Sequence, residues 1–398
     1  MLRVAVPTRL TLPFCRTKVG VPEVSTTGYR GGVVFDGVSL RPECDLLVGD
    51  GRVLALARGA ARGADRVVDL DGDLLSPGLI DLQVNGGGGV MFNDMPSAAG
   101  LRRMVAAHAP LGTATLLPTL ITDTPDTVLA AISAVETAVA DGETAVAGLH
   151  LEGPHLSVAR CGAHDPALVR TMTPADLAVL IEARRRLPAL WVTVAPESVS
   201  LEQVGALIRA GVTVSLGHTD ADCDTCRAYF DAGVSVTTHL FNAMRQLGSR
   251  EPGLVGAVLA HASVSAGLIA DGVHVHPTSL RVAWQAMQPA GRAFLVSDAM
   301  ACAGSELQSF ALGARTVHRA AGRLTLDDGT LAGADLDLPR ALRVLVERVG
   351  VPLDQALRAA TSTPADLLRL GAGHGRLAVG QPARLIRFDS ALHFKGWP

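Results

Sequence analysis

Several apolar runs of this chain stop on a residue that can bind a metal ion or transfer a proton. The residues at these run ends are Gln83, Asn85, Glu152, His218, His239 and Asp298. Among them, one carboxylate and two imidazoles form a ligand set that zinc uses in hydrolases, with a coordination position left for water. We therefore predict that Glu152, His218 and His239 hold one divalent cation.

A single histidine at a strand end is a weak signal, because a buried histidine is often a hydrogen-bonded core residue. Three metal-binding side chains at the ends of three runs make that explanation much less favourable. Asp298, in "AFLVSDAM", closes the last run. Its carboxylate could accept a proton from water and pass it to a leaving group. The alternative role for Asp298 is a helix N-cap.

The elements that must gather these residues are repeated βα units. From Ser76 onward, short apolar runs alternate with helical stretches rich in alanine and arginine, as in parallel α/β folds. The predicted strands are 78–85, 113–119, 145–152, 191–197, 212–219, 234–241, 265–271 and 293–298. A closed parallel barrel has this number of strands, and its active site lies where they all end.

Helices are expected between the strands, at 126–140 after Thr124 and at 174–187, where Thr173 can cap the first turn. Residues 308–333 read as a hairpin-rich insertion with an Asp-Gly turn in "LTLDDGTLAG". A pair of helices is expected at 337–349 and 352–360.

A second, smaller unit is predicted from both chain ends. Residues 30–76 contain short alternating pieces with a hairpin-like turn at Gly51, and "GRLAVGQPARLIRFD" near the other end is strand-like again. The expected fold is an α/β (β/α)8 TIM-like barrel over 77–374, with a small β-sandwich-like domain from 30–76 and 375–398. Residues 1–29 form an extension of unknown structure.

Composition fits a large buried core, since 48% of the 398 residues are hydrophobic and 18% are charged. A net charge of −3 gives no reason to expect nucleic acid or an anionic membrane as a partner. The only lysines are Lys18 and Lys395. A Schiff-base lysine, a metal-bridging carbamylated lysine and a P-loop lysine are therefore excluded from 19–394.

The six cysteines do not suggest a disulfide framework in a chain of this length, and the Cys223/Cys226 pair lacks the second pair of a structural zinc site. Pro7 and Pro13 interrupt the start of the chain, so no secretory signal is expected. The apolar stretch 253–270 is broken by glycines, serines and His261, which argues against a membrane span. We expect a soluble cytoplasmic protein.

Several strings together resemble the N-acetylglucosamine-6-phosphate deacetylases of the amidohydrolase superfamily. These strings are "PGLIDLQVNGGGG", "HLEGPH", "CGAHDP", "GHTDA", "THLFNAM", "REPGLVG", "IADGVHV" and "VSDAM", and the similarity runs roughly from residue 30 to residue 390. The resemblance implies a (β/α)8 barrel with a small β domain. It also implies hydrolysis of N-acetylglucosamine 6-phosphate to glucosamine 6-phosphate and acetate.

The family's metal ligands fall on Glu152, His218 and His239, and its acid/base falls on Asp298. Its substrate contacts fall on Ala163, His164, Asn242, Ala243, Arg250, Asp271, Gly272, Val273, His274, Leu331, Ala332 and Gly333. In such enzymes the arginine at the position of Arg250 reaches the phosphate from a neighbouring subunit. The resemblance therefore implies a homodimer acting on a small sugar phosphate.

Most of the superfamily carries H-x-H on the first strand, where this chain has Gln83 and Asn85. Neutral amides are poor ligands beside imidazole. We expect one tightly held cation, zinc or alternatively ferrous iron, and a second weak metal near Gln83 and Asn85 stays open.

In the expected mechanism the metal, with His164, polarises the acetyl carbonyl. His274 and the backbone near Asn242 bind the phosphate together with Arg250. A surface ion pair with Glu251 or another neighbour is the alternative role for Arg250. His155, His276 and Cys161 are assigned no role.

Two other functions are compatible with the sequence. The first is an amidohydrolase acting on a cyclic amide or another N-acetyl sugar phosphate. The second is a non-catalytic sugar-phosphate-binding barrel that keeps a metal, which the intact Asp298 disfavours.

Overall fold

The computed structural model describes residues 25–288 and 293–398. Its centre is an eight-stranded parallel sheet in the order β17-β16-β15-β14-β13-β12-β11-β8. The strands are β8 Leu79–Val84, β11 Thr113–Ile121, β12 Leu149–Glu152, β13 Leu190–Val194, β14 Thr213–Leu216, β15 Val236–Thr237, β16 Ser265–Leu268 and β17 Ala293–Leu295. All eight predicted strands are present, and the predicted barrel is confirmed.

The first and last strands meet just beyond their ends. The backbone N–H of Asp298 donates to the carbonyl of Gln83 over 3.0 Å, and Val84 forms a parallel bridge with Ala299. The carboxylate of Asp81 on β8 accepts the N–H of Ser297 at 3.1 Å. These contacts bring β8 and the end of β17 side by side, so the sheet is nearly a closed barrel.

The barrel interior is built from the apolar runs seen in the sequence. All five residues of β13, "LWVTV", are buried, as are all six residues of β8. Strands covered on both faces need side chains of this kind at almost every position, because one face meets the barrel interior and the other meets helices.

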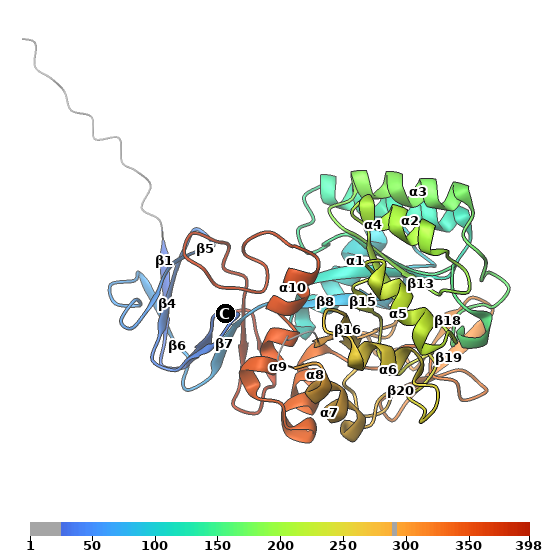
Figure 1. Cartoon of the computed structure of the whole chain (residues 1–398). Coiled ribbons are helices and arrows are strands. Elements are labelled where there is room, and N and C mark those ends of the chain that lie inside the picture. Colours follow the sequence, from blue (N-terminus) through green and yellow to red (C-terminus); the bar gives the residue numbers. More distant parts are fainter. Residues whose placement is uncertain (1–24, 289–292) are drawn as a thin grey trace, which may run out of the picture.

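Helices cover the outside of the barrel (Figure 1). They are α1 Ala98–His108, α2 Pro125–Ala140, α3 Pro174–Arg186, α4 Leu201–Arg209, α5 Cys223–Asp231, α6 Gly253–Ala260, α7 Pro277–Ala286, α8 Leu338–Arg343, α9 Leu353–Ala359 and α10 Ser362–Leu367. Helix α8 continues as a π-helical turn over Val344–Val349. Thr173 caps α3 in a reciprocal pair with Asp176, as its sequence position predicts.

Two small sheets lie at one end of the barrel (Figure 1). One has the order β5-β4-β1-β6 and the other β22-β21-β7-β2-β3. Their strands are β1 Thr26–Arg30, β2 Val33–Phe35, β3 Leu40–Arg41, β4 Asp45–Gly49, β5 Arg52–Ala57, β6 Arg66–Asp69, β7 Leu74–Pro77, β21 Leu385–Phe388 and β22 Phe394–Gly396. Antiparallel pairing of Ile386 with Ser76 joins the two chain ends.

The first of these strands begins earlier than expected. Strand β1 starts at Thr26, inside the stretch 1–29 for which no structure was predicted, and it pairs with β4 and β6. Residues 1–24 lie outside the described residues.

An antiparallel sheet of three strands lies at the opposite end of the barrel (Figure 1). It consists of β18 Ser309–Leu312, β19 Arg315–Ala320 and β20 Arg323–Thr325, and we call it the three-stranded insertion. It matches the hairpin-rich segment expected at 308–333. A short hairpin of β9 Gly86–Gly87 and β10 Val90–Met91 also follows β8.

Within the described ranges, the helices are too short or too polar to cross a bilayer.

Candidate metal centre and active site

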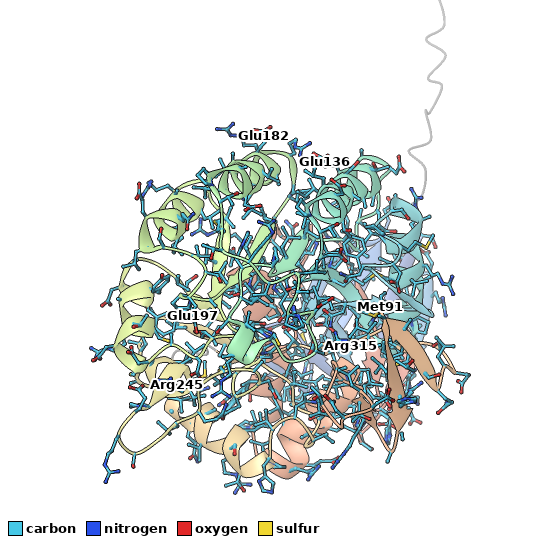
Figure 2. All side chains as sticks on the ribbon, turned by 90° about the vertical axis from the view of Figure 1, so that its right-hand side faces the viewer. Met91, Glu136, Glu182, Glu197, Arg245 and Arg315 are labelled. Carbon is cyan, nitrogen blue, oxygen red and sulfur yellow. The ribbon has the colours of Figure 1, made fainter. Side chains whose placement is uncertain are left out.

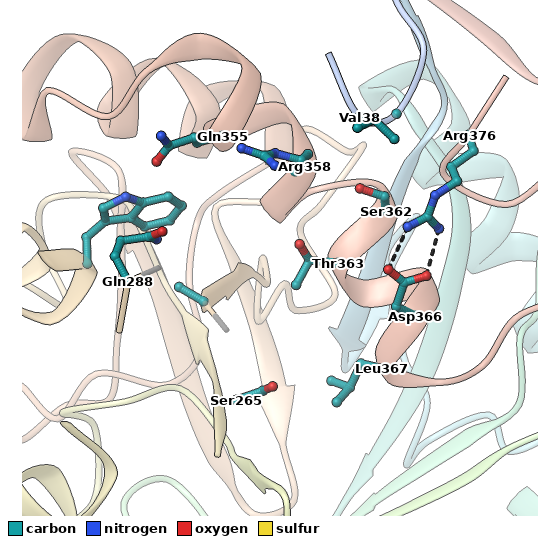
Figure 3. A pocket seen from close by; sticks show the side chains of 13 residues that line it. Val38, Ser265, Gln288, Gln355, Arg358, Ser362, Thr363, Asp366, Leu367 and Arg376 are labelled. Atoms are coloured by element: carbon teal, nitrogen blue, oxygen red, sulfur yellow. Dashed lines mark hydrogen bonds and ion pairs between the residues drawn. The ribbon is translucent and has the colours of Figure 1, made fainter. Parts of the chain in front are cut away.

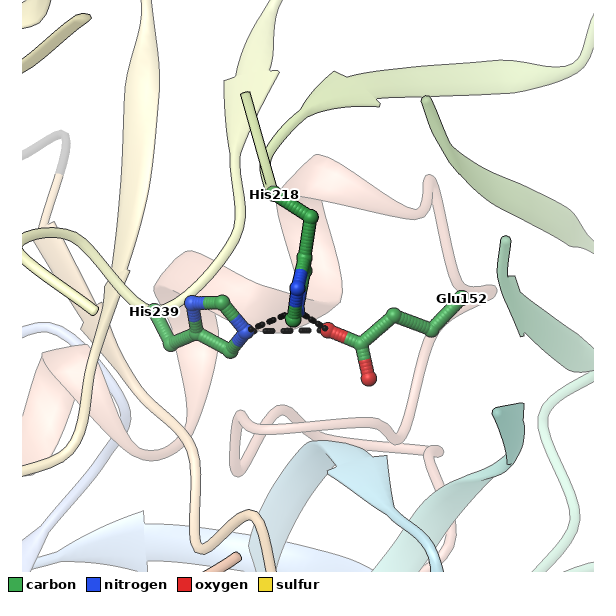
Figure 4. A group of neighbouring side chains, drawn as sticks. All are labelled: Glu152, His218 and His239. Carbon is green, nitrogen blue, oxygen red and sulfur yellow. Dashed lines mark hydrogen bonds and ion pairs between the residues drawn. The ribbon is translucent and has the colours of Figure 1, made fainter. Parts of the chain in front are cut away.

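Glu152, His218 and His239, here called the ligand triad, come together at the carboxyl ends of three strands of the barrel. Glu152 is the last residue of β12, while His218 and His239 follow β14 and β15. The Oε1 atom of Glu152 lies 3.2 Å from Nε2 of His218 and 2.9 Å from Nε2 of His239 (Figure 4). The two Nε2 atoms are 3.0 Å apart.

The chemistry of this donor set fits a divalent cation. All three side chains are buried, and one ligand atom from each lies within 4.8 Å of the others. Burial opposes charge on Glu152, but its contacts with His218 and His239 hold the pKa of its carboxyl well below the usual range. Two imidazole nitrogens that converge on an ionised carboxylate form a nitrogen and oxygen ligand set typical of zinc.

The backbone bends sharply where these side chains enter the site. His218, His239 and Asp298 have φ angles of 48°, 20° and 52°. This left-handed region is rare for residues with a side chain and costs on the order of 1–3 kcal/mol each. The bend takes each residue out of its strand ladder and turns the side chain over the end of the barrel.

Asp298 faces the ligand triad and is held by two amides. Its Oδ1 accepts a hydrogen bond from Asn85 at 2.7 Å and another from Gln83 at 3.2 Å. Burial and the nearby charge of Glu152 raise the pKa of Asp298. A buried aspartate with a raised pKa is better suited than an ordinary aspartate to accept and return a proton.

Gln83 is positioned as a hydrogen-bond donor to the two carboxylates. Its Nε2 also donates to Oε1 of Glu152 at 3.1 Å, while its Oε1 accepts from the hydroxyl of Thr238 at 2.8 Å. With its oxygen engaged, Gln83 presents its N–H groups to the site.

His164 packs against the ligand triad from the loop after β12. Its ring centroid is 4.4 Å from that of His218, and its Nε2 lies 3.8 Å from Oε2 of Glu152. Burial, reinforced by the neighbouring His218, lowers the pKa of His164 to about 3. The ring is therefore neutral near pH 7.

The partner that orients His164 is Thr122, which the sequence analysis missed. The backbone N–H of Thr122 donates to Nδ1 of His164 at 3.3 Å, and its hydroxyl lies 2.7 Å from the same atom. Strand β11 extends to Ile121, two residues past its predicted end at 119. A longer strand would have placed Thr122 at the same face as the other site residues.

A cavity of about 310 Å³ is lined by the ligand triad together with Asn85, His164 and Asp298. Predicted substrate contacts that line it are Ala163, His164, Asn242, Ala243, His274, Leu331 and Gly333. It is also lined by Ile121, Gly162, Phe241, Met300 and Thr330, which the sequence did not indicate. The apolar residues among them cannot be recognised as substrate contacts from the sequence, because apolar residues are also found throughout the core.

Five other predicted contacts do not line this cavity, namely Arg250, Asp271, Gly272, Val273 and Ala332. Asp271 is buried, and its carboxylate accepts the N–H groups of Val273 and His274, both at 2.8 Å. Its other oxygen lies 2.6 Å from Nδ1 of His274. Asp271 thus orients His274, while Ala332 is fully buried.

Arg250 is exposed, in the segment between His239 and α6. The suggested ion pair with Glu251 is disfavoured, because Oε1 of Glu251 accepts the N–H groups of Cys223 and Gly253.

Cys223 and Cys226 lie in the first turn of α5 as free thiols. His155 contacts the carbonyl of Arg170, and His276 caps α7.

A larger cavity of about 500 Å³ lies at the other end of the barrel, beside the first residues of β16 and β17. Figure 3 shows its polar lining, in which Arg376 forms an ion pair with Asp366. The ligand triad is the one group of possible metal ligands among the described residues, and it lies in the smaller cavity. The smaller cavity is therefore the candidate active site.

A metal-ligand cluster above the carboxyl ends of a parallel barrel defines a class of metal-dependent hydrolases. The chain belongs to the amidohydrolase family, whose family model matches residues 74–396. The resemblance stated from the sequence is thereby confirmed.

Relatives with known names include an N-acetylgalactosamine-6-phosphate deacetylase from Shewanella sp. (strain ANA-3). It is 40% identical over 362 residues, covering 90% of this chain and 91% of the relative. An N-acetylglucosamine-6-phosphate deacetylase from Haemophilus influenzae is 34% identical over 326 residues, covering 81% and 84% of the two chains.

Two solved structures match almost the whole fold. The N-acetylglucosamine-6-phosphate deacetylase from Pasteurella multocida has a TM-score of 0.89 at 30% identity, covering 94% of this chain and 98% of its own. A mutant of the Mycobacterium smegmatis enzyme, in complex with N-acetyl-D-glucosamine-6-phosphate, has a TM-score of 0.86 at 34% identity. It covers 94% of this chain and 99% of its own.

Proposed function

We propose that this protein is a metal-dependent deacetylase that hydrolyses N-acetylglucosamine 6-phosphate to glucosamine 6-phosphate and acetate. The observation that carries the proposal is the convergence of the ligand triad with Asp298 and His164 in one cavity. Each of these residues has a chemical task in amide hydrolysis.

A divalent cation on the ligand triad would supply a Lewis acid that polarises the acetyl carbonyl and makes water a nucleophile near neutral pH. Asp298 accepts the proton of the attacking water. It then returns that proton to the sugar nitrogen, because an amine anion is a very poor leaving group. The amides of Gln83 and Asn85 hold its Oδ1 in place for both transfers.

His164 stabilises the negative charge that develops on the carbonyl oxygen. Because its Nδ1 accepts the backbone N–H of Thr122, the ring proton lies on Nε2, which faces the site. A neutral imidazole with this tautomer can donate a hydrogen bond to an oxyanion. The lowered pKa of His164 keeps the ring in this form.

The 6-phosphate would be bound by His274, by the backbone near Asn242 and by Arg250. Arg250 offers a bidentate fork that suits phosphate. Since Arg250 is exposed and does not line the cavity of its own chain, we place it at the site of a neighbouring subunit in a homodimer. Zinc is the proposed cation, with ferrous iron as the alternative that accepts the same ligands.

N-acetylgalactosamine 6-phosphate is a second candidate substrate. The relative that is 40% identical over most of the chain is named for this sugar. The two sugars differ only at the 4-hydroxyl, so the same cation, Asp298 and His164 would serve either one.

We also propose a cytoplasmic location, which agrees with the free thiols of the five described cysteines.

The experiment is a parallel assay of acetate release from both sugar phosphates, from unphosphorylated N-acetylglucosamine and from a cyclic amide. Elemental analysis of the same sample gives the metal content. Release from either phosphate at a far higher kcat/KM than from the other two compounds supports the proposal. Binding of sugar phosphate without acetate release would indicate the non-catalytic alternative.

A further inference from the structure

A charged network beside the cavity joins loops that follow three different strands of the barrel. Its centre is Asp220, two residues after His218. The Oδ1 atom of Asp220 accepts a hydrogen bond from Nε of Arg160 at 2.8 Å, and its Oδ2 accepts one from Arg245, also at 2.8 Å. One carboxylate thus holds two guanidinium groups, one from the loop after β12 and one from the loop after β15.

The arm through Arg160 reaches a ligand of the triad. The carbonyl oxygen of Arg160 lies 2.9 Å from Nδ1 of His218. The backbone N–H of Ser157, in the same loop, donates to the carbonyl of His218, also at 2.9 Å. Because Nδ1–H of His218 is donated to Arg160, the lone pair of the ring lies on Nε2, which faces Glu152 and His239.

The arm through Arg245 reaches the substrate side of the cavity instead. The backbone N–H of Arg245 donates to the carbonyl of Thr219 at 3.1 Å. Arg245 closely follows Asn242 and Ala243, which line the cavity. It lies on the same side of the barrel mouth as Glu197, whereas Arg315 lies on the other side (Figure 2).

Glu197 holds the backbone at Thr219 and Asp220 in place. Its two carboxylate oxygens accept the hydroxyl of Thr219 and the N–H of Asp220, both at 2.7 Å. The position of Asp220 therefore does not depend on its own side chain. The side chain of Asp220 is left to fix the two arginines.

We propose that Asp220 is a positioning residue for the metal centre, acting through Arg160 on the ring of His218. This inference depends on the proposed metal site and not on which sugar phosphate is hydrolysed. Arg160 sits in a single 3-10 turn, Val158–Arg160, and its guanidinium is held by Asp220. Without that carboxylate the turn can move, and the carbonyl that orients His218 moves with it.

The expected effect is a loss of metal affinity. Removing a group that orients a metal-binding histidine typically weakens the metal by about 10–100-fold. Asp220→Ala and Arg160→Met should both raise the zinc dissociation constant by this amount. Arg245→Met should leave it within about threefold of the parent and raise KM instead, because the Arg245 arm leads to the Asn242 loop.

The measurement is competition for zinc between the metal-free protein and a chelator of known affinity, made without substrate. Asp366→Ala is the matched control, since Asp366 forms a comparable aspartate–arginine pair with Arg376 at the far end of the barrel. Asp220→Asn, which keeps an acceptor for Arg160, should give an intermediate value. Thermal unfolding of the metal-free variants separates this effect from a general loss of stability.

Unchanged zinc affinity in Asp220→Ala, with Asp366→Ala as reference, would overturn the inference. The same holds if Asp220→Ala weakens zinc while Arg160→Met does not, because the path through Arg160 would then be wrong. If Asp220→Ala does not fold, Arg160→Met decides alone. Since no substrate is present, these outcomes are independent of acetate release and can be told apart from failure of the proposed function.

Discussion

At the scale of residues, His164 and His218 carry their ring protons on different nitrogens because their outer nitrogens meet opposite backbone groups. Nδ1 of His164 accepts the N–H of Thr122, which leaves the proton on Nε2. Nδ1 of His218 lies 2.9 Å from the carbonyl of Arg160 and must donate to it. One ring is thereby prepared to donate to an oxyanion and the other to bind a cation.

Thr122→Val tests this role of His164. The hydroxyl 2.7 Å from Nδ1 is lost while the backbone N–H remains. Loss of one hydrogen bond of about 1 kcal/mol predicts a decrease in kcat/KM of roughly fivefold to tenfold. Steady-state kinetics gives the value, and zinc affinity should not change. A variant with normal kinetics would remove Thr122 from the account.

Asp298→Asn should keep the metal and lose turnover. Asparagine can still accept from Asn85 and Gln83, but it cannot take a proton from water. We expect kcat to fall by about 10²–10⁴ with an unchanged metal content. Kinetics and elemental analysis on one preparation test this, and near-normal turnover would contradict the assignment of Asp298.

Asp81 predicts a dependence of stability on pH. This carboxyl is fully buried, and burial raises its pKa to about 7, whereas an unfolded aspartate titrates near about 4. Between these values the folded chain keeps a proton that the unfolded chain releases. The stability from that proton is complete below about pH 4 and is lost as the pH rises through 7.

Over the full range from about pH 4 to about pH 7 the loss is about 4 kcal/mol, since one pKa unit corresponds to about 1.4 kcal/mol. Asp81→Asn stays neutral at every pH, so its free energy of unfolding should fall less than that of the parent between pH 5 and pH 8. Denaturant titrations at both values measure the difference. If the free energy of unfolding falls equally in parent and variant between pH 5 and pH 8, the carboxyl of Asp81 is already ionised in the folded chain at pH 5.

At the scale of elements, the barrel strands could be predicted because buried parallel strands are nearly unbroken apolar runs. The ends of these strands could be predicted less accurately. The run 234–241 contains a strand of only two residues, Val236–Thr237, because the backbone of His239 and its neighbours turns into the left-handed region. An apolar pattern indicates which residues are buried, but it does not indicate where the backbone leaves the hydrogen-bonded sheet.

The ligand triad and Asp298 could be predicted because strand ends converge in a barrel. The residues that orient the rings of His164 and His218, namely Thr122, Arg160 and Asp220, could not. Their types are common on any surface, and their partners come from loops far apart in the sequence. Only the folded chain shows which hydroxyl or backbone carbonyl meets which ring.

The three-stranded insertion is predicted to shape the substrate side of the cavity. Arg315 of β19 donates a hydrogen bond to the carbonyl of Ala163, next to His164. Arg315→Met should raise KM by about threefold to tenfold, with a smaller change in kcat, because the loop then closes less tightly over the sugar. Arg323→Met, at an exposed position of β20, is the matched control. Equal kinetics for the two variants would contradict this role.

At the scale of the whole molecule, the proposed phosphate contact of Arg250 calls for a second chain. Arg250 is exposed and lies outside the cavity of its own subunit, so a phosphate contact through Arg250 depends on a partner's cavity. A dimer with twofold symmetry would exchange this arginine in both directions. Arg250→Ala alone should raise KM for the sugar phosphate, because a bidentate contact to the phosphate is lost.

Mixing two defective variants tests the exchange. When Arg250→Ala and Asp298→Asn chains are dissociated and reassociated together, each mixed dimer contains one site with both residues intact. Random pairing predicts recovery of about a quarter of the parent activity. No recovery, with mixed dimers shown to be present, would place Arg250 in its own subunit's site or outside the site.

The most direct test of the central claim is a zinc titration of the metal-free protein, followed by acetate release from N-acetylglucosamine 6-phosphate and N-acetylgalactosamine 6-phosphate. We predict that acetate release rises with added zinc and reaches its plateau at one equivalent per chain. Removing a ligand with Glu152→Gln should abolish the rise. A plateau at two equivalents, or acetate release that does not depend on metal, would contradict the account.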